Sequence, residues 1–218
     1  MSEAAYSPKP RAAAKTVRKS SPRIARKQDQ RREGILKVGA EVFAELGYHR
    51  ASLEEIADRV DLTRAALYHY FPSKDALLSE CLQYGADQAI SRLSDVFEST
   101  IEQDVDSRLA ALIHTQLTII TNDSREVSRL FLNPMDWPET FRAQVKKMRD
   151  RHDKFFRSVI NDGLASGEFN CIDADVAHHC LHGGINYSAV WLRPQRPGLA
   201  RSIDQVVKSL LLLFHAPA

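Results

Sequence analysis

Apolar residues recur every three or four positions through most of the chain, and this spacing predicts helices. No stretch shows the two-residue alternation of a β-strand, and no period of roughly 20–50 residues indicates a repeat. The pattern therefore predicts an all-α fold. The expected helices lie at about 28–46, 52–60, 63–71, 73–99, 107–121, 124–132, 138–166, 174–191 and 199–214.

The stretch from Ser52 to Phe71, SLEEIADRVDLTRAALYHYF, predicts two short helices joined by a tight turn. Ser52 followed by Glu55 forms a capping box for the first helix, and Thr63 is a good N-cap for the second. With Leu67 and Phe71 turned inward, a small surface with one Arg faces outward and suits a DNA major groove. Spacing alone also fits a helical hairpin with a polar outer face. The outward residues are Thr63, Arg64, Ala65, Tyr68 and His69.

Positive charge is concentrated at the N-terminus. Residues 1–32 hold ten Lys or Arg and two acids, a net charge of +8, whereas the whole chain carries +2. Residues 1–27 also contain three prolines and little that is apolar, which predicts a disordered basic arm. Such an arm attracts phosphates of a polyanion. A solvated tail that aids solubility is the alternative.

Residues 28–74 have the length of an independent three-helix DNA-binding module. The segments FAELGYHRASLEEIADRV and LTRAALYHYF, followed by Pro72, Ser73 and Lys74, resemble the DNA-binding domain of the tetracycline-repressor (TetR) family. Asp61 stands where family members usually place a glycine, and Asp tolerates the left-handed region of backbone conformation.

The resemblance implies roles on double-stranded DNA for individual residues. Arg64 would read a guanine edge, with Ala65 beside it on the same face. Phosphate or sugar contacts would come from Thr63, Tyr68, His69 and Lys74, with one more from Ser52, and Tyr68 has a thymine methyl as its alternative target.

A long helix at 73–99, about 38 Å in length, would connect this module to the rest of the chain. Residues 75–218 are then expected to form a helical ligand-binding and dimerisation domain. The final helix carries apolar residues around most of its circumference, which predicts burial, most simply against a second copy. TetR-family proteins dimerise through their last two helices, and a homodimer matches a palindromic operator. A larger monomeric core is the alternative.

The segment GGINYSAVWLRPQRPG is similar to that of TetR-family members responsive to acyl-CoA or steroid-catabolic CoA thioesters. Basic residues of the helix at 138–166 could bind a CoA diphosphate, although a solvated basic face is the simpler reading. An efflux repressor that senses an uncharged or cationic apolar compound is a further alternative. The predicted effector-binding residues are Phe131, Met148, Arg149, His152, Phe156, His182, Tyr187, Trp191 and Arg193.

His178 and His182 stand four residues apart, a spacing that can place two imidazoles on one metal ion. No Glu lies between them as in a zinc hydrolase, and no third ligand is evident. The two histidines are therefore expected to line the pocket or the dimer interface, with no metal and no cofactor. No catalytic spacing is recognisable, so an enzyme is not expected. A metal-binding or enzymatic protein, or an architectural DNA-binding protein without effector, remains the alternative of another class.

The three cysteines Cys81, Cys171 and Cys180 are scattered, as in proteins with reduced thiols. No apolar run approaches the roughly 20 residues of a membrane span, and no apolar segment follows the basic N-terminus as in a signal peptide. The expectation is a cytoplasmic, ligand-responsive transcriptional regulator, a repressor released from its operator by a small apolar effector.

Overall fold

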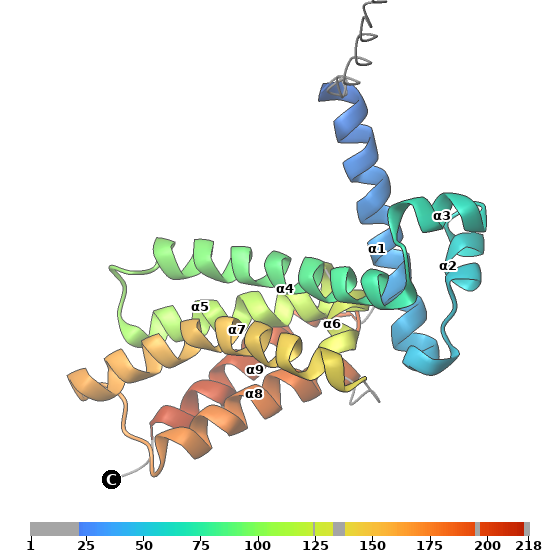
Figure 1. Ribbon diagram of the computed structural model, residues 1–218. Helices are drawn as coiled ribbons and strands as arrows, with labels where there is room; N and C mark the ends of the chain where they lie inside the picture. The colour runs from blue at the N-terminus through green and yellow to red at the C-terminus, as the bar shows by residue number, and fades with distance from the viewer. Residues whose placement is uncertain (1–21, 124, 133–137, 195–196, 216–218) are drawn as a thin grey trace, which may run out of the picture.

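The computed structural model describes residues 22–123, 125–132, 138–194 and 197–215 of the 218. Every regular element within these ranges is a helix, apart from one isolated bridge between Asn170 and His215. The predicted all-α fold is confirmed. Figure 1 shows a small unit of α1, α2 and α3 at one end of a bundle formed by α4 to α9.

Helix α1 (Pro22–Arg50) begins earlier than the prediction of Gln28. Residues 22–27, predicted to be part of a disordered arm, are therefore helical, and the rest of that predicted arm lies outside the described residues. Gly47 interrupts α1 with a φ of 77°, close to the predicted end of the helix. A positive φ costs glycine little because it has no Cβ.

The two short helices α2 (Leu53–Arg59) and α3 (Arg64–Tyr70) form with the predicted caps. The Ser52 hydroxyl accepts a hydrogen bond from the Glu55 amide, and the Thr63 hydroxyl accepts one from the Ala66 amide. Asp61 lies in the turn between them with a φ of 57°, the left-handed conformation that its side chain tolerates.

Helix α4 (Lys74–Ser99) starts at its predicted cap Ser73 and runs from the three-helix unit along the bundle (Figure 1). Helix α5 (Val105–Thr118) begins two residues before the prediction because Asp104 accepts a hydrogen bond from the Ser107 amide at 2.8 Å. A π-helical turn η1 (Ile119–Asp123) follows it and leads towards α6 (Arg125–Leu132). Such turns are frequent at functional sites.

Helices α7 (Glu139–Ser166), α8 (Ala174–Trp191) and α9 (Leu199–Leu211) complete the bundle, and α9 continues into a short 3-10 turn η2 (Leu212–Phe214). Pro138 occupies the N-cap of α7 rather than the predicted first helical position. Gly167 ends α7 in the left-handed conformation with a φ of 78°, and Asp173 caps α8 as predicted.

Two apolar clusters hold the chain together. The first joins the buried faces of α1, α2 and α3 to the start of α4 and to Leu130, Phe141, Val145 and Met148 from α6 and α7. The second joins the remaining length of α4 to α5, α7, α8 and α9. The core of the three-helix unit is thus continuous with part of the bundle, since α1 packs directly on both α4 and α6.

Among the described residues, none of the helices combines the length and the apolar character that a membrane span requires.

Candidate DNA-binding surface and effector cavity

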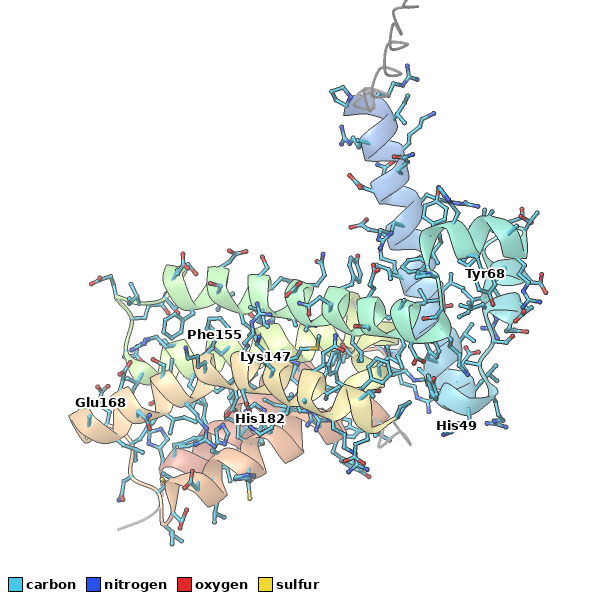
Figure 2. The ribbon with its side chains drawn as sticks, in the orientation of Figure 1. His49, Tyr68, Lys147, Phe155, Glu168 and His182 are labelled. Atoms are coloured by element: carbon cyan, nitrogen blue, oxygen red, sulfur yellow. The ribbon has the colours of Figure 1, made fainter. Side chains whose placement is uncertain are left out.

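Helix α3 presents one exposed face and one buried face. Leu67 and Phe71 are fully buried, so the opposite side of the helix is open to solvent. The structure brings together five of the predicted DNA-contacting residues on that exposed side. They are Thr63, Arg64, Ala65, Tyr68 and His69. Tyr68 lies at the end of the molecule remote from the bundle that contains His182 (Figure 2).

Arg64 is held by an acidic neighbour from α2. Its Nε lies 2.8 Å from Glu54 Oε1, and its Nη2 donates to the Tyr68 hydroxyl at 3.4 Å. The hydrogen bond to Tyr68 and the charge of Glu54 raise the pKa of Arg64, so this group stays charged. Because the Arg64 and Glu54 side chains are 63% and 46% exposed, water screens the pair and Arg64 can exchange it for a base edge.

Lys74 is turned away from that surface. Its Nζ donates to the Tyr48 carbonyl at 2.9 Å and to the Ala51 carbonyl at 3.1 Å, and it lies 4.3 Å from the centre of the Tyr48 ring. The predicted phosphate contact therefore does not lie with the residues of α3. Lys74 instead connects the start of α4 to the end of α1 and to Ala51, the residue that follows α1. Ser52 is half-buried at the start of α2, where its hydroxyl caps the helix.

A cavity of about 610 Å³ opens between α4, the end of α5 with η1, α6, α7 and α8. This volume lies within the range of about 300–1,000 Å³ that is usual for small-molecule sites. Five predicted effector-binding residues line it: Phe131, Met148, Arg149, His152 and His182. His178, expected at the pocket or the dimer interface, also lines the cavity, whereas most of the other lining residues were not predicted from the sequence. Among the unidentified lining residues are Ala86, Ala89 and Ile90 of α4, Ile119 and Ile120 of η1, and Asp153 of α7.

The other predicted effector residues lie elsewhere. Phe156 is buried behind the lining, with its ring 5.4 Å from that of His152 and 5.0 Å from that of His182. Tyr187, Trp191 and Arg193 are exposed and do not line the cavity. The reason is helical phase: Trp191 comes about two and a half turns after His182 and so faces the opposite side of α8.

A cluster of titratable groups forms one wall of the cavity. Asp153 Oδ1 of α7 lies 2.6 Å from His178 Nε2 and 3.0 Å from His182 Nε2, both on α8, and Figure 2 labels His182 within the bundle. Burial lowers the pKa of His178, and it lowers the pKa of His182 and of His152 to about 4. The imidazoles are therefore neutral near pH 7.

Asp153 stays ionised in this wall. Burial alone would raise its pKa, but a hydrogen bond from Arg157 and the neighbouring histidines outweigh burial and lower it. Arg157 Nε lies 2.7 Å from Asp153 Oδ2, and its Nη1 lies 3.1 Å from Asp175 Oδ1. Asp153 is 25 residues before His178 in the chain, so no local spacing signals that these side chains meet.

The side of α8 opposite the cavity exposes large apolar residues next to η2. We call this surface the outer face; it consists of Val176, Tyr187, Val190, Trp191 and Leu212, which are 59%, 68%, 62%, 39% and 69% exposed. The adjacent glycines have different environments. A Cβ on Gly183 would meet no atom within 4 Å, whereas a Cβ on Gly184 would lie 2.6 Å from Leu210 Cδ2. Gly184 thus permits close packing of α8 on α9 within one chain.

The apolar circumference of the last helix is largely covered by the same chain. Val207 and Phe214 are buried, and Val206, Leu210, Leu211 and Leu213 pack against the second cluster. Burial within a larger core of one chain, the alternative to burial in a dimer, therefore explains most of the apolar residues of the last helix. The exposed residue Leu212 belongs to the outer face.

The helix-turn-helix and the bundle each match a known protein family. Residues 35–81 match the family described as bacterial regulatory proteins, tetR family, and residues 102–212 match the tetracyclin repressor-like C-terminal domain. The chain belongs to the TetR family. It is accordingly a DNA-binding transcriptional regulator.

Similar TetR proteins include the HTH-type transcriptional repressor KstR2 of Mycobacterium tuberculosis, 27% identical over 87% of this chain and 95% of KstR2. The HTH-type transcriptional activator FasR of Mycolicibacterium smegmatis is 34% identical over 55% of this chain and 53% of FasR. The fold is shared with AibR, whose crystal structure holds isovaleryl coenzyme A and operator DNA, at a TM-score of 0.71 and 23% identity, over 84% of this chain and 98% of AibR.

Proposed function

We propose that this TetR-family chain acts as a homodimeric repressor, and that a thioester of coenzyme A with an apolar acyl group releases it from a palindromic operator. The observation that carries the proposal is the position of the cavity. Its wall includes Met148 and Phe131, and both pack in the cluster that also holds the helix-turn-helix. An occupant of the cavity would therefore act on the packing beneath the DNA-binding helices.

The cavity interior suits an acyl group. Ile90, Ile119, Ile120, Phe131 and Met148 supply apolar walls from four different elements. Ligand sites commonly combine such walls with a few polar groups that fix orientation. Those polar groups here are the imidazoles of α7 and α8 together with Gln116, whose side-chain oxygen accepts a hydrogen bond from His152 Nε2 at 2.9 Å.

Cations at the edge of the cavity suit the phosphates of coenzyme A. Arg149 lines both the cavity and a second hollow of about 270 Å³, which is also lined by Arg142 and Lys146. Guanidinium groups bind phosphate oxygens through paired hydrogen bonds. Arg142 and Lys146 have acidic partners, Glu139 at 3.6 Å and Asp150 at 2.8 Å, but both pairs are exposed and can be exchanged for a phosphate.

The outer face supports the dimer. TetR proteins dimerise through their last two helices, and five of the nine exposed large apolar residues in the described part of the chain lie on α8 and η2. Two copies joined there would carry two α3 helices, which fits an operator of two related half-sites.

The named relatives fit this regulatory class but differ in the direction of regulation. KstR2 is named a repressor and FasR an activator, while AibR was crystallised with isovaleryl coenzyme A. Repression is proposed because the repressor resembles this chain over most of its length. Since AibR shares the fold alone, its ligand selects the class of compound to test. A cationic apolar effector is the second candidate, because Asp150 and Asp153 also line the cavity.

The test begins with selection of DNA that the purified chain binds from a random pool. Release of the selected DNA is then measured against acyl-CoA thioesters of increasing acyl length, free coenzyme A, the free acids and apolar cations. We expect thioesters to release the DNA and to raise the melting temperature of the protein. The Arg149→Ala variant should need a higher thioester concentration for release than the control variant Arg201→Ala, because Arg201 is an exposed residue of α9 outside the cavity. Release by cations alone would replace the thioester with the second candidate.

A further inference from the structure

Three side chains of metal-binding type meet on the wall of the cavity. Asp153 comes from α7 and His178 and His182 come from adjacent turns of α8, and each offers one ligand atom within 4.8 Å of the others. The pair of histidines four residues apart lacked a third ligand in sequence. The packing of α7 on α8 supplies a carboxylate for that position.

The distances within this cluster are close to those of a coordination sphere. Metal–ligand bonds of about 2.0–2.1 Å place neighbouring ligand atoms about 2.9 Å apart at right angles and about 3.3 Å apart at tetrahedral angles. Asp153 Oδ1 is 2.6 Å from His178 Nε2 and 3.0 Å from His182 Nε2. An ion would fit between the ligand atoms if they moved apart by a few tenths of an ångström.

The surroundings of the three ligands also fit an ion. Arg157 holds the second oxygen of Asp153 at 2.7 Å, as the outer partners of metal ligands do. His182 Nε2 is buried and, despite its 3.0 Å approach to Asp153, has no hydrogen-bond partner among the described residues. A network of hydrogen bonds alone would leave this nitrogen atom unsatisfied.

We propose that Asp153, His178 and His182 bind one divalent transition-metal ion, of the zinc, cobalt or nickel kind, on the wall of the cavity. Two imidazoles and one carboxylate favour such ions over magnesium or calcium, which prefer oxygen ligands. Three protein ligands leave further coordination positions, and these face the cavity that the three residues line. The ion would bridge α7 to α8 and offer a binding point to an oxygen atom of an effector.

The site is independent of which effector the protein binds. Metal binding requires only that each imidazole presents an unprotonated ring nitrogen to the ion, and no group of the effector takes part in the three-ligand set. The three ligands come from α7 and α8, so a bound metal would stabilise the packing of α7 on α8, and α8 also bears the outer face.

Cobalt binding to the untagged full chain tests the proposal, because a polyhistidine tag binds the same ions. Metal-free protein is titrated with Co²⁺, followed by visible d–d absorption and by the ion retained after gel filtration. We expect one Co²⁺ per chain, displacement by Zn²⁺, and a higher melting temperature with metal. His182→Ala and Asp153→Asn should weaken binding by more than the roughly 10–100-fold typical of an outer partner, and Arg157→Ala should fall within that range.

His179→Ala is the matched control, because His179 is an exposed histidine of the same helix whose ring bonds the Asp175 carbonyl at 2.7 Å. Equal loss of cobalt from this variant and from His182→Ala would mean surface binding and would overturn the proposal, as would unchanged binding in Asp153→Asn. Should the variants fail to fold, anomalous diffraction from cobalt-soaked crystals of the unaltered chain decides. A peak between the three ligands supports the site, and its absence there refutes it.

Discussion

Replacing Tyr187 by Asp tests whether the outer face of α8 joins two copies of the chain. Tyr187 is 68% exposed, and its neighbours on this surface are Val190, Trp191 and the open position at Gly183. The substitution removes an aromatic ring from the surface and adds a carboxylate. Because the side chain has little contact with its own chain, we expect the fold of the isolated protomer to survive.

The magnitude follows from the area that Tyr187 can bury. A large aromatic side chain buries about 150–250 Å² when fully covered, so a ring that is 68% exposed offers about 100–170 Å². At about 25 cal/mol per Å² this is about 2.5–4 kcal/mol per protomer, and twice that for a two-fold dimer. This sum is an upper bound, since ordering and imperfect packing reduce it. Adding the cost of two facing carboxylates, we expect dimer dissociation to rise about 100-fold or more.

Sedimentation velocity over a range of protein concentrations measures this effect, and fluorescence anisotropy with operator DNA measures its consequence. The control is Ile101→Asp, an equivalent change at a residue that is 57% exposed between α4 and α5, away from the outer face. Tyr187→Asp should sediment as a monomer and lose operator affinity, while Ile101→Asp should match the parent. A Tyr187→Asp protein that stays dimeric at the parent's concentrations would refute the assignment of this face.

Three further predictions concern DNA binding and stability. Arg64→Ala should lower the affinity for selected DNA far more than the affinity for random DNA, and equal losses on both would contradict base reading. Glu54→Gln should raise the affinity for both DNAs, because it frees Arg64 and removes a negative charge. Deletion of residues 1–21, which are rich in Lys and Arg, should make the dependence of binding on salt shallower, and an unchanged slope would exclude phosphate contacts. The pKa values of His152 and His182 near 4, against an ordinary 6.5, mean that the unfolded chain takes up protons that the folded chain does not. Metal-free protein should therefore keep its full stability above pH 6.5 and lose on the order of 2 kcal/mol per histidine by pH 5, measured by urea unfolding, with a smaller loss in His152→Gln.

Local signals in the sequence were sufficient for the helix-turn-helix. A cap depends on residues three positions apart, so Ser52 with Glu55 and Thr63 with Ala66 could be identified from the sequence. The left-handed turn at Asp61 is local as well. The exposed face of α3 follows from the burial of Leu67 and Phe71, because helical periodicity then determines which residues point outward.

Features that depend on packing between distant segments could not be predicted in the same way. Lys74 reaches carbonyl groups at Tyr48 and Ala51, and their position depends on how α1 ends beside α4. Asp153 meets the histidines of α8 only because α7 and α8 pack together. The resemblance of the segment around Tyr187 and Trp191 to CoA-responsive TetR proteins predicted that these residues line the cavity, whereas helical phase turns them outward.

The cavity lies where the two apolar clusters meet, and this position explains how one occupant could affect both ends of the protein. Met148 belongs to the cluster shared with the DNA-binding helices, whereas Ile120 belongs to the cluster shared with α8 and α9. A ligand that separates these walls changes the packing of the first cluster against α1. It also changes the packing of the second cluster against α8, which bears the outer face. It favours release from DNA only to the extent that it binds the released arrangement more tightly. By the same linkage, operator DNA must weaken effector binding by the factor with which the effector weakens operator binding. Unequal factors would show that the effector and the operator do not act on one shared equilibrium under the conditions of the two measurements.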